Sequence, residues 1–364
     1  MTEPSASPAR ARLARVLPLL PAVVLFATAM LVARSFAPAA GSGPGGSPAA
    51  GGTGATGGPA APPSGPYTGP PLAGVFVNCS PACDLIAASP GAGLRLTFTD
   101  RAVDESAPTL SPDGDAVAFR CGAPAVEAGG AESPRPRGPG SICRISTTPP
   151  GSESATPFPV TTLLSDPHVD YGAPAWSPEG STLAFAFRSA AGESGIGLWD
   201  LVGSVATTVT EPGMEAANPA WSPDGSTLAF GCGTVAGPEG APEARFCVMP
   251  RTGGMVTALG AVSGDCGAPT FTPDAAQLAV VCVGPGTAGG DLFYLALSEP
   301  MSRSITRDQL MAPEGKRRLV FSPDGRFVYV RRDDALWAIE LATEMWSLPP
   351  LPPLHGDFDV RVIQ

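Results

Sequence analysis

The stretch NPAWSPDGSTLAFGC, residues 218–232, recurs in related form at four other places in this chain of 364 residues. The other copies are APTLSPDGDAVAFRC from residue 107, APAWSPEGSTLAFAF from residue 173, APTFTPDAAQLAVVC from residue 268 and LVFSPDGRFVYVR from residue 319. Their central prolines are 66, 45, 50 and 50 residues apart. Self-similarity with a period of this length is typical of propellers and solenoids. The chain is therefore a repeat protein.

Each copy predicts a β-hairpin closed by a tight turn. Proline presets φ, the acidic side chain accepts backbone N–H groups, and glycine takes the positive φ that such turns need. The flanking residues alternate as in a strand with one buried face. One acid recurs at the same turn, so we interpret these acids as turn caps rather than metal ligands or acid–base groups. The turn residues are Pro112, Asp113, Gly114, Pro178, Glu179, Gly180, Pro223, Asp224, Gly225, Pro273, Asp274, Pro323, Asp324 and Gly325, with Ala275 replacing the glycine of the fourth copy.

Two further strands are expected after each hairpin. An apolar or aromatic strand is predicted at residues 198–201, 246–249, 293–295 and 336–339, and more polar fourth strands at residues 206–210 and 255–259. Four antiparallel strands make one propeller blade. Trp176 and Trp221 occupy the same position in two copies, where the other copies are also apolar. We interpret both as packing between blades rather than as ligand platforms.

The two ends of the repeat region complement each other. Residues 75–78, 84–88 and 94–99 match the second, third and fourth strands of a blade, and residues 357–363, DFDVRVI, alternate as a lone strand. Together they complete one blade, which gives 24 strands in all. The predicted fold is all-β: a six-bladed β-propeller of four-stranded antiparallel blades over residues 72–364, with an insertion at residues 122–140. Closing the ring with strands from both ends removes exposed sheet edges.

The N-terminal segment predicts a membrane anchor. Residues 1–15 carry three arginines, and residues 16–33 are then uncharged up to Arg34. Eighteen helical residues at about 1.5 Å each span roughly 27 Å, close to the thickness of a bilayer core. The arginine bias predicts a cytoplasmic tail at residues 1–15, a single transmembrane anchor at residues 16–36 and an extracytoplasmic remainder. The alternative is a cleaved signal peptide, with small residues at 37–39 for the peptidase.

Residues 37–71 are almost entirely Gly, Ala, Pro, Ser and Thr. Such a segment has too few large apolar groups to offset its ordering entropy, so it predicts a disordered linker. Ala, Gly and Pro dominate elsewhere too, and Lys316 is the single lysine among 22 basic residues, a composition that indicates a GC-rich bacterial genome.

The cysteines support the same strand alignment. Those at the ends of second strands pair with those in a neighbouring strand of the same blade, which predicts the disulfides Cys79–Cys83, Cys121–Cys143, Cys232–Cys247 and Cys266–Cys282. Disulfides require an oxidising compartment, in agreement with the predicted orientation. Zinc is the alternative, but the tight C-x-x-C pairs of zinc sites are missing and the chain has only His168 and His355.

The repeated unit P-x-W-S-P-D-G-x-x-L-A-F resembles the TolB-type, or WD40-like PD40, β-propeller repeat over residues 72–364. The resemblance implies the fold, whereas propellers host binding proteins and enzymes alike. The TolB family has an α/β domain ahead of its propeller, where this chain has the predicted anchor and linker. The partner contacts of that family are therefore not carried over.

Charge and motifs favour a binding protein. A net charge of −11 with 15% charged residues provides no basic surface, which argues against nucleic acid. We expect a membrane-tethered, extracytoplasmic module without cofactor or metal that binds a protein, peptide or glycan of the cell envelope. Candidate contacts are Arg135 and Arg137 in the insertion and a loop at residues 234–243. The alternative is that both segments are ordinary solvated loops.

An enzyme is the alternative function. Propellers of this repeat type also precede the hydrolase domain of prolyl oligopeptidase-like peptidases, but that domain needs a G-x-S-x-G elbow, which this sequence lacks. A propeller lyase or hydrolase working with carboxylates would use residues at the channel. His355, Asp357 and Asp359, on or beside the predicted closing strand, form the cluster to test.

Overall fold

The computed structural model describes residues 64–79, 83–89, 92–97, 104–122, 139–147, 159–237, 242–284, 290–298, 302–304, 318–332, 335–351 and 358–362. The chain divides into Met1–Thr56 and Gly57–Gln364, and the first unit lies outside the described residues. The predicted tail, anchor and most of the predicted linker therefore lie outside them too. Within the described part, no helix is long and apolar enough to cross a membrane.

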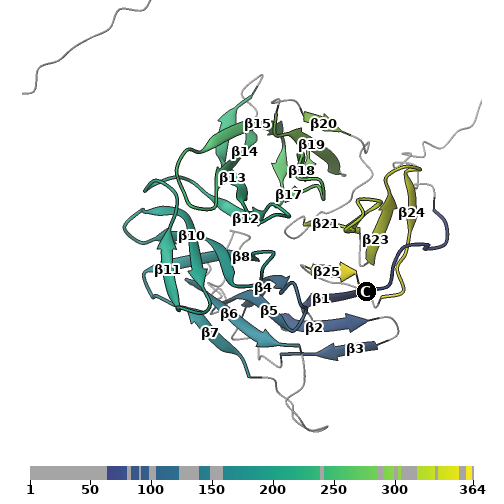
Figure 1. Ribbon diagram of the computed structural model, residues 1–364, viewed down its shortest axis with the longest axis horizontal. Helices are drawn as coiled ribbons and strands as arrows, with labels where there is room; N and C mark the ends of the chain where they lie inside the picture. Colours follow the sequence, from purple (N-terminus) through teal and green to yellow (C-terminus); the bar gives the residue numbers. More distant parts are fainter. Residues whose placement is uncertain are drawn as a thin grey trace, which may run out of the picture. The chain divides into compact units, whose positions relative to one another are not determined.

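The described strands form six antiparallel sheets around a central axis, as the six-bladed prediction requires (Figure 1). Blade I contains β25 (Phe358–Val362), β1 (Leu72–Cys79), β2 (Cys83–Ser89) and β3 (Ala92–Arg95). Blade II contains β4 (Asp104–Leu110), β5 (Ala116–Gly122), β6 (Gly140–Ser146) and β7 (Thr161–Leu164). Blade III contains β8 (Val169–Trp176), β9 (Thr182–Ser189), β10 (Ser194–Asp200) and β11 (Val205–Thr208).

The remaining blades follow in chain order. Blade IV contains β12 (Ala217–Trp221), β13 (Thr227–Ala236), β14 (Pro242–Pro250) and β15 (Thr257–Ser263). Blade V contains β16 (Asp265–Cys266), β17 (Thr270–Phe271), β18 (Gln277–Val283), β19 (Gly290–Ala296) and β20 (Ser302–Ser304). Blade VI contains β21 (Leu319–Phe321), β22 (Phe327–Arg332), β23 (Ala335–Glu340) and β24 (Met345–Ser347).

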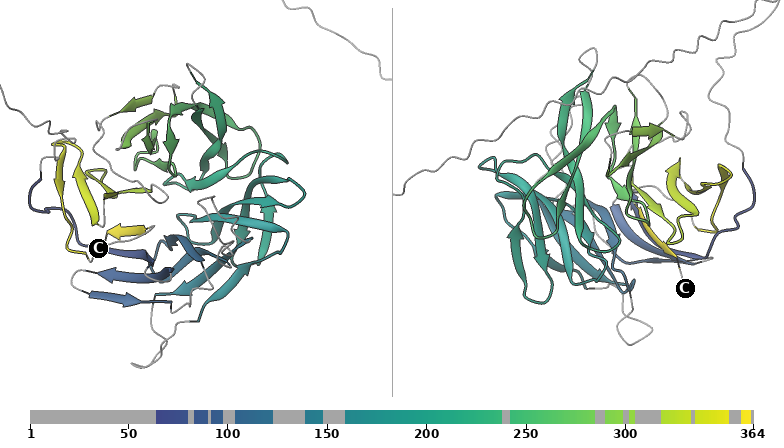
Figure 2. Two further views of the ribbon diagram at one scale, coloured as in Figure 1. Left: turned by 180° about the vertical axis from the view of Figure 1, so that it is seen from behind. Right: turned by 45° about the horizontal axis from the view of Figure 1, so that its top comes forward.

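Ring closure follows the predicted three-plus-one pattern. The C-terminal strand β25 pairs with β1 in antiparallel register, with Phe358 opposite Phe76 and Val362 opposite Leu72. Figure 2 shows this strand, in yellow, beside the blue-purple strands of the first repeat. The two ends of the repeat region therefore share one sheet.

The strand count differs from the prediction in blade V. Its innermost strand is split into β16 and β17, which both pair with β18, so the structure has 25 strands in its described part instead of 24. Pro269 precedes β17 and has no N–H for the ladder, which explains the break. In blades II, III and IV a register shift just before or at the equivalent proline keeps the innermost strand continuous.

Two predicted boundaries are wrong. Both ends of the expected loop at residues 234–243 are strand, because Thr234 pairs with Ala244 and Ala236 with Pro242 across the β13–β14 hairpin. The fourth strand of blade I was expected at residues 94–99, but β3 is Ala92–Arg95. There Leu96 and Thr97 both donate to the carbonyl oxygen of Leu85, at 2.8 and 3.5 Å, which interrupts a regular ladder.

The predicted linker also ends earlier than residue 71. Residues 64–71 lie against blade VI, where the N–H of Gly65 donates to the carbonyl oxygen of Trp346 at 2.8 Å. The ring of Tyr67 lies 6.1 Å from that of Phe327, and its hydroxyl is 3.2 Å from the hydroxyl of Tyr329. Tyr67 is the aromatic residue of this Gly/Ala/Pro-rich segment, and its burial against the propeller is the physical reason for the difference.

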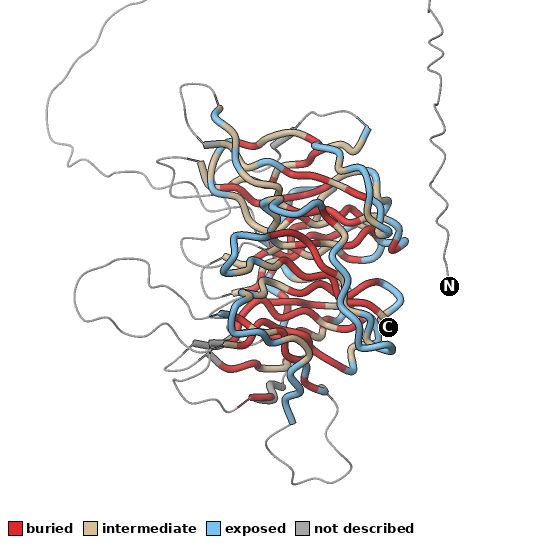
Figure 3. Tube along the Cα trace, turned by 90° about the vertical axis from the view of Figure 1, so that its left-hand side faces the viewer, coloured by how far each residue is buried: buried red, intermediate tan, exposed pale blue. Residues whose placement is uncertain are grey.

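The hydrophobic core lies between blades. The second strands supply fully buried side chains such as Val117, Leu228 and Val328, and these contact neighbouring blades. Figure 3 shows the buried residues along the strands and many of the exposed ones in the connecting turns. Because both faces of each sheet are covered by other blades, the ring has one continuous packed layer.

The motif turns repeat one hydrogen-bond pattern. In blade IV the N–H of Gly225 donates to the carbonyl oxygen of Ser222 at 2.9 Å, and the N–H of Thr227 donates to Ser222 Oγ at 2.9 Å. The hydroxyl of Ser222 donates to Asp224 Oδ1 at 2.6 Å, and the N–H of Ser226 donates to the same oxygen at 3.0 Å. These bonds lower the pKa of Asp224, with the Ser222 hydroxyl as the largest cause. The acid is a turn cap.

Candidate functional site: the central channel

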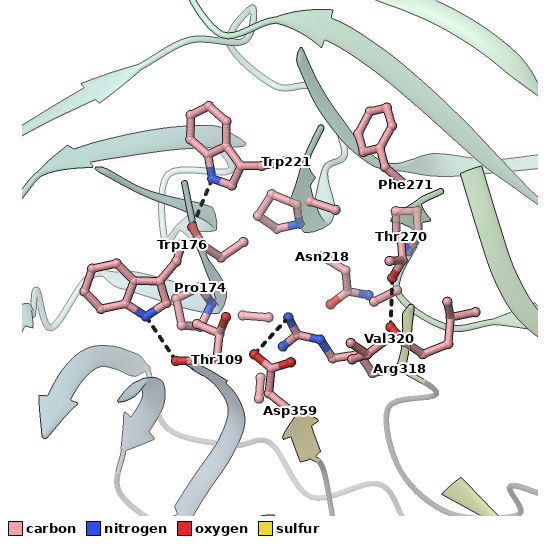
Figure 4. A pocket seen from close by; sticks show the side chains of 18 of the residues that line it. Thr109, Pro174, Trp176, Asn218, Trp221, Thr270, Phe271, Arg318, Val320 and Asp359 are labelled. Carbon is pink, nitrogen blue, oxygen red and sulfur yellow. Dashed lines mark hydrogen bonds and ion pairs between the residues drawn. The ribbon is translucent and has the colours of Figure 1, made fainter. Parts of the chain in front are cut away.

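The innermost strands of the ring enclose a cavity of about 240 Å³ (Figure 4). Six prolines line it: Pro108, Pro174, Pro219 and Pro269 from the innermost strands or their edges in four consecutive blades, and Pro178 and Pro223 from two motif turns. Trp176, Trp221 and Phe271 add aromatic carbon. A buried apolar cavity of about 150 Å³ already accepts benzene, so this channel has room for an aromatic ring and more.

The prolines follow from the repeat itself. In each of these four copies the proline is three positions before the Ser or Thr of the turn. The residue directly before this proline is alanine or asparagine. A proline lacks the N–H of a ladder, so it suits an innermost strand whose free edge faces the channel. The preceding residues Ala107 and Asn218 have φ of 51° and 50°, which marks the local bulge.

One ion pair crosses the channel. Arg318, just before β21 of blade VI, and Asp359, in β25 of blade I, are the charged residues among the described residues that line the cavity. Arg318 Nη2 lies 3.6 Å from Asp359 Oδ2, and Arg318 Nη1 donates to the carbonyl oxygen of Pro108 in blade II at 2.8 Å. Figure 4 shows the guanidinium reaching over the carboxylate. A single side chain therefore connects three blades.

Asp359 is held firmly in place. Its Oδ2 accepts the N–H of Leu110 at 2.8 Å, and its Oδ1 accepts the N–H of Val360 at 3.1 Å. Asp359 is 7% exposed. The carboxylate predicted on the closing strand does face the channel, and its partners come from blades I, II and VI.

The two tryptophans stabilise the channel wall. Trp176 Nε1 donates to the carbonyl oxygen of Thr109 at 3.0 Å, and Trp221 Nε1 donates to that of Ala175 at 3.1 Å. Each bond joins one blade to the preceding blade. Both side chains are nearly buried, at 9% exposure, and pack among side chains of neighbouring blades. The rings therefore pack between blades while their edges line the cavity.

Several predicted site residues cannot be placed. Arg135 and Arg137 in the insertion, and His355 and Asp357 before the closing strand, lie outside the described residues.

Arg318 was missed by the sequence interpretation. It occupies the position where the other four copies have Ala107, Ala173, Asn218 and Ala268. Beginning the fifth copy one residue earlier, at 318, would have revealed an arginine in place of a small residue or asparagine.

Three disulfides form between the cysteines that the strand alignment paired: Cys121–Cys143, Cys232–Cys247 and Cys266–Cys282. Each contains one cysteine of a second strand, in β5, β13 or β18. Cys79 and Cys83 are opposite each other in the β1–β2 register, but their side chains lie outside the described part, so that disulfide stays a prediction.

Comparison with known proteins identifies the fold. No model of a known protein family matches the chain, and no curated protein matches its sequence. Solved structures do match, and the fold that they share with this chain is the TolB-like six-bladed propeller. The repeat family that the sequence resembles is thus supported through its fold, and the narrower PD40 assignment is not confirmed by any family model.

The matching structures are distant relatives in sequence. TolB from Acinetobacter baumannii is 18% identical to this chain, with a TM-score of 0.54. The match covers 80% of this chain and 65% of the TolB chain, which is less than two thirds of its length. The putative TolB from Agrobacterium tumefaciens is 14% identical with a TM-score of 0.51, and the match covers 81% of this chain and 99% of the matched chain. Oligogalacturonate lyase from Vibrio parahaemolyticus is 11% identical with a TM-score of 0.50, and the match covers 75% of this chain and 73% of the lyase chain. At such identities the likeness concerns the fold alone.

The described channel is lined mostly by apolar groups, with one carboxylate and one guanidinium among them. Asp359 is the only carboxylate among the described residues that line the cavity. Within the described part of the chain, no group of three or more His, Cys, Asp or Glu side chains is arranged to hold a metal ion. The walls supply apolar surface, and Arg318 supplies hydrogen-bond donors, which is the usual make-up of a small binding pocket.

Proposed function

We propose that this protein is a non-catalytic binding or scaffold module of the cell envelope. In this proposal residues 16–36 anchor the chain in the membrane with the N-terminus in the cytoplasm, and the extracytoplasmic propeller binds a protein, peptide or glycan. The observation that carries the proposal is the difference between the two faces of the ring.

One face consists of the motif turns and of the connections between third and fourth strands, and we call it the turn face. Its polar backbone groups are largely bonded within each turn, as in Ser111–Ala116 and Ser322–Phe327. A surface of near-identical turns whose donors and acceptors are already used offers little that distinguishes one partner from another.

The opposite face carries the hairpins between second and third strands, and we call it the hairpin face. These connections differ from blade to blade: β5 ends at Gly122 and β6 begins at Gly140, whereas β9 ends at Ser189 and β10 begins at Ser194. Cys121–Cys143 and Cys232–Cys247 join the two strands of such a hairpin, and Cys266–Cys282 joins the second strand of blade V to its innermost strand. Bracing of variable loops lowers the ordering cost of binding, which supports recognition on this face.

The channel cavity is a second candidate surface. Pro178, Ser222 and Pro223 of the motif turns are among its lining residues, so the cavity reaches the turn face. Asp359 Oδ2 accepts the N–H of Leu110, the residue directly before the turn serine Ser111. The ion pair of Asp359 with Arg318 therefore lies nearer the turn face than the hairpin face.

Two arguments support binding over catalysis. Hydrolysis or elimination by carboxylates needs a general acid and a general base, and Asp359 is the single carboxylate among the described residues of the cavity. Its oxygens already accept two backbone N–H groups. The TolB-like fold itself is neutral, because structures named TolB and oligogalacturonate lyase share it.

The test is affinity capture from cell-envelope extract with the oxidised full-length chain. We expect a specific protein or glycan that is lost when the disulfides are reduced. Two double variants test which face binds the partner, and all four positions are exposed. The first carries Glu193→Arg and Thr234→Arg on the hairpin face. The second carries Val202→Arg and Met255→Arg on the turn face. Loss of capture only with the hairpin-face pair supports the proposal, and loss only with the turn-face pair contradicts the assigned face.

The proposed orientation has its own test. Protease added to spheroplasts is expected to digest the propeller, because the disulfides imply an oxidising compartment outside the cytoplasmic membrane. A cytoplasmic marker protein serves as the control for intact membranes. Protection of the propeller together with that marker would contradict the proposed location.

A further inference from the structure

We propose that the channel binds a carboxylate carried on an apolar, ring-sized body, and that the guanidinium of Arg318 is the group that recognises this carboxylate. The proposal deepens the binding function above and rests on it. It names the chemistry of the ligand group and the residue that selects it.

The shape and composition of the cavity suit such a body. Its volume of about 240 Å³ exceeds the roughly 150 Å³ that suffices for benzene. Pro108, Pro174 and Pro219 present pyrrolidine rings from three blades, and Trp176 and Trp221 present aromatic edges. These walls contribute apolar area and few hydrogen bonds, so they favour a compact apolar or aromatic group over a polar one.

Arg318 has more donors than partners. A guanidinium carries five N–H groups. Among the described residues its partners are the carbonyl oxygen of Pro108 at 2.8 Å and the carboxylate of Asp359 at 3.6 Å. The Arg318 side chain is 27% exposed, so it remains accessible from the cavity. Hydrogen-bond donors beside apolar walls have few alternative partners. A ligand that accepts their hydrogen bonds therefore gains binding free energy.

Asp359 does not use up this capacity. A direct charge-assisted N–H···O bond measures about 2.7–2.9 Å, and the Arg318–Asp359 distance of 3.6 Å is longer. Asp359 is instead held by the N–H groups of Leu110 and Val360. The planar fork of arginine matches a carboxylate in two-point geometry, which neither a carbonyl nor a hydroxyl of a ligand reproduces.

The negative charge of Asp359 predicts in which direction a substitution changes the affinity for an acid. Asp359 attracts Arg318 but repels an incoming carboxylate, so its charge limits affinity. Asp359→Asn keeps the size of the side chain and removes that repulsion. If Arg318 selects carboxylates, this substitution strengthens the binding of an acid and leaves the binding of the matching amide nearly unchanged.

The experiment measures binding to the full-length chain by calorimetry and by tryptophan fluorescence, to which Trp176 and Trp221 at the cavity contribute. The probes are 3-phenylpropionate and 3-phenylpropionamide, and an N-acetylated dipeptide ending in phenylalanine as the free acid and as the amide. We expect the acid of at least one pair to bind about 10-fold or more tightly than its amide, because charged hydrogen bonds have that magnitude. A preference for the small acid indicates a free organic acid, and a preference for the dipeptide acid indicates the C-terminus of a peptide.

Variants decide the role of Arg318. Arg318→Met is expected to reduce the acid preference to within about 2-fold, Arg318→Lys to keep part of it, and Asp359→Asn to raise acid affinity several-fold. Arg326→Met is the matched control, since Arg326 is paired with Glu340 and does not line the described cavity. An unchanged acid preference in Arg318→Met overturns the proposal. If Arg318→Met does not fold, failure of Asp359→Asn to strengthen acid binding overturns it instead.

Failure of this inference is distinguishable from failure of the proposed function. If neither acid is preferred while an envelope partner is still captured, the binding module stands and the carboxylate site is wrong. If an acid binds as predicted and no macromolecule is captured, the channel site stands and the macromolecular partner is wrong.

Discussion

At the residue scale, the turn serine is as important as the acid beside it. The equivalents of Ser222 are Ser111, Ser177, Thr272 and Ser322, and all five are buried. Each hydroxyl accepts the N–H that begins the next strand, and four of them donate to the motif aspartate, as Ser322 does to Asp324. Glu179 instead bonds Arg251 of the next blade at 2.8 Å.

Ser222→Ala tests this buried hydroxyl. The substitution leaves the partly buried N–H of Thr227 without its acceptor, so we expect a loss of about 1–3 kcal/mol in the free energy of unfolding. Ser226→Ala, in the same turn but exposed, is the matched control and should cost less. Denaturant unfolding measures both. Equal effects of the two substitutions would show that the buried acceptor has no special role.

The missing glycine of the fourth turn leaves a strained residue. Ala275 has φ of 57°, in the left-handed region that Gly225 occupies with φ of 71°. Ala275→Gly is expected to raise stability by about 0.5–1 kcal/mol, because relief of the strain exceeds the added entropy of the unfolded chain. Gly225→Ala should lower stability by a similar or larger amount, since its Cβ would also approach Glu179 at 3.2 Å. Thermal unfolding measures both, and a destabilised Ala275→Gly contradicts the argument.

At the element scale, polar contacts connect several of the blades in addition to apolar packing. The tryptophan N–H groups join blades II, III and IV. Arg120, at 5% exposure, donates to the carbonyl oxygen of Tyr171 at 3.0 Å and to Asp170 at 2.9 Å, between blades II and III. Glu105 of β4 joins blade II to blade I. Its carboxylate accepts hydrogen bonds from the hydroxyl of Thr97 at 2.5 Å and from the N–H of Leu85 at 3.1 Å.

Glu105 makes stability depend on pH. Burial, together with the charge of Asp84, raises the pKa of Glu105 to about 7, although the bonds from Thr97 and Leu85 and the charge of Arg95 oppose the shift. A carboxyl whose pKa is higher in the folded state stabilises the fold fully below its unfolded pKa of 4.5 and loses this contribution as pH rises through about 7.

Glu105→Gln tests this sign. Relative to the variant, the wild-type chain is expected to lose roughly 2–3 kcal/mol of stability between about pH 4.5 and pH 8. Urea unfolding at several pH values gives the difference between the two proteins, which cancels the other titrating groups. A difference that does not change with pH would show that Glu105 is ionised to the same extent in the folded and unfolded chains.

At the scale of the whole molecule, the C-terminal strand closes the ring. β25 pairs with β1 on one side, while Asp359 receives the N–H of Leu110 in blade II and faces Arg318 of blade VI. Phe358 and Val360 are buried in the cluster that also contains Leu72 and Phe327. The last strand of the chain therefore holds together blades at both ends of the repeat.

Deletion of residues 358–364 tests closure. The edge of β1 loses its partner and the cluster around Phe358 becomes exposed, so we expect a lower melting temperature and association into oligomers. Deletion of residues 363–364, which follow β25, is the control and should leave the protein unchanged. Light scattering and thermal unfolding measure the outcome, and addition of the peptide FDVRVIQ should restore the monomer. A stable monomer after the longer deletion would contradict the closing role.

Local sequence patterns predicted most of the fold. Turn positions, strand alternation and the pairing of Cys121, Cys232 and Cys266 with their partners all depend on residues close together in the chain. The turn and strand patterns were also recognisable because they recur five times. The end of the linker was missed because Tyr67 gains its contacts from Phe327 and Tyr329, more than 250 residues later. The hairpin at residues 234–243 was missed because Gly and Pro obscured its strand pattern.

By itself the sequence determined the repeat, the blade, the number of blades and the way in which the two ends share a sheet, because these follow from periodic local preferences. The tertiary structure alone decided the channel. Pro108, Arg318 and Asp359 come from three distant parts of the chain and meet because the ring closes. The buried carboxyl of Glu105 likewise acquires its raised pKa from the seam between two blades. Contacts of this kind depend on the packing of one repeat against another, which no single repeat encodes.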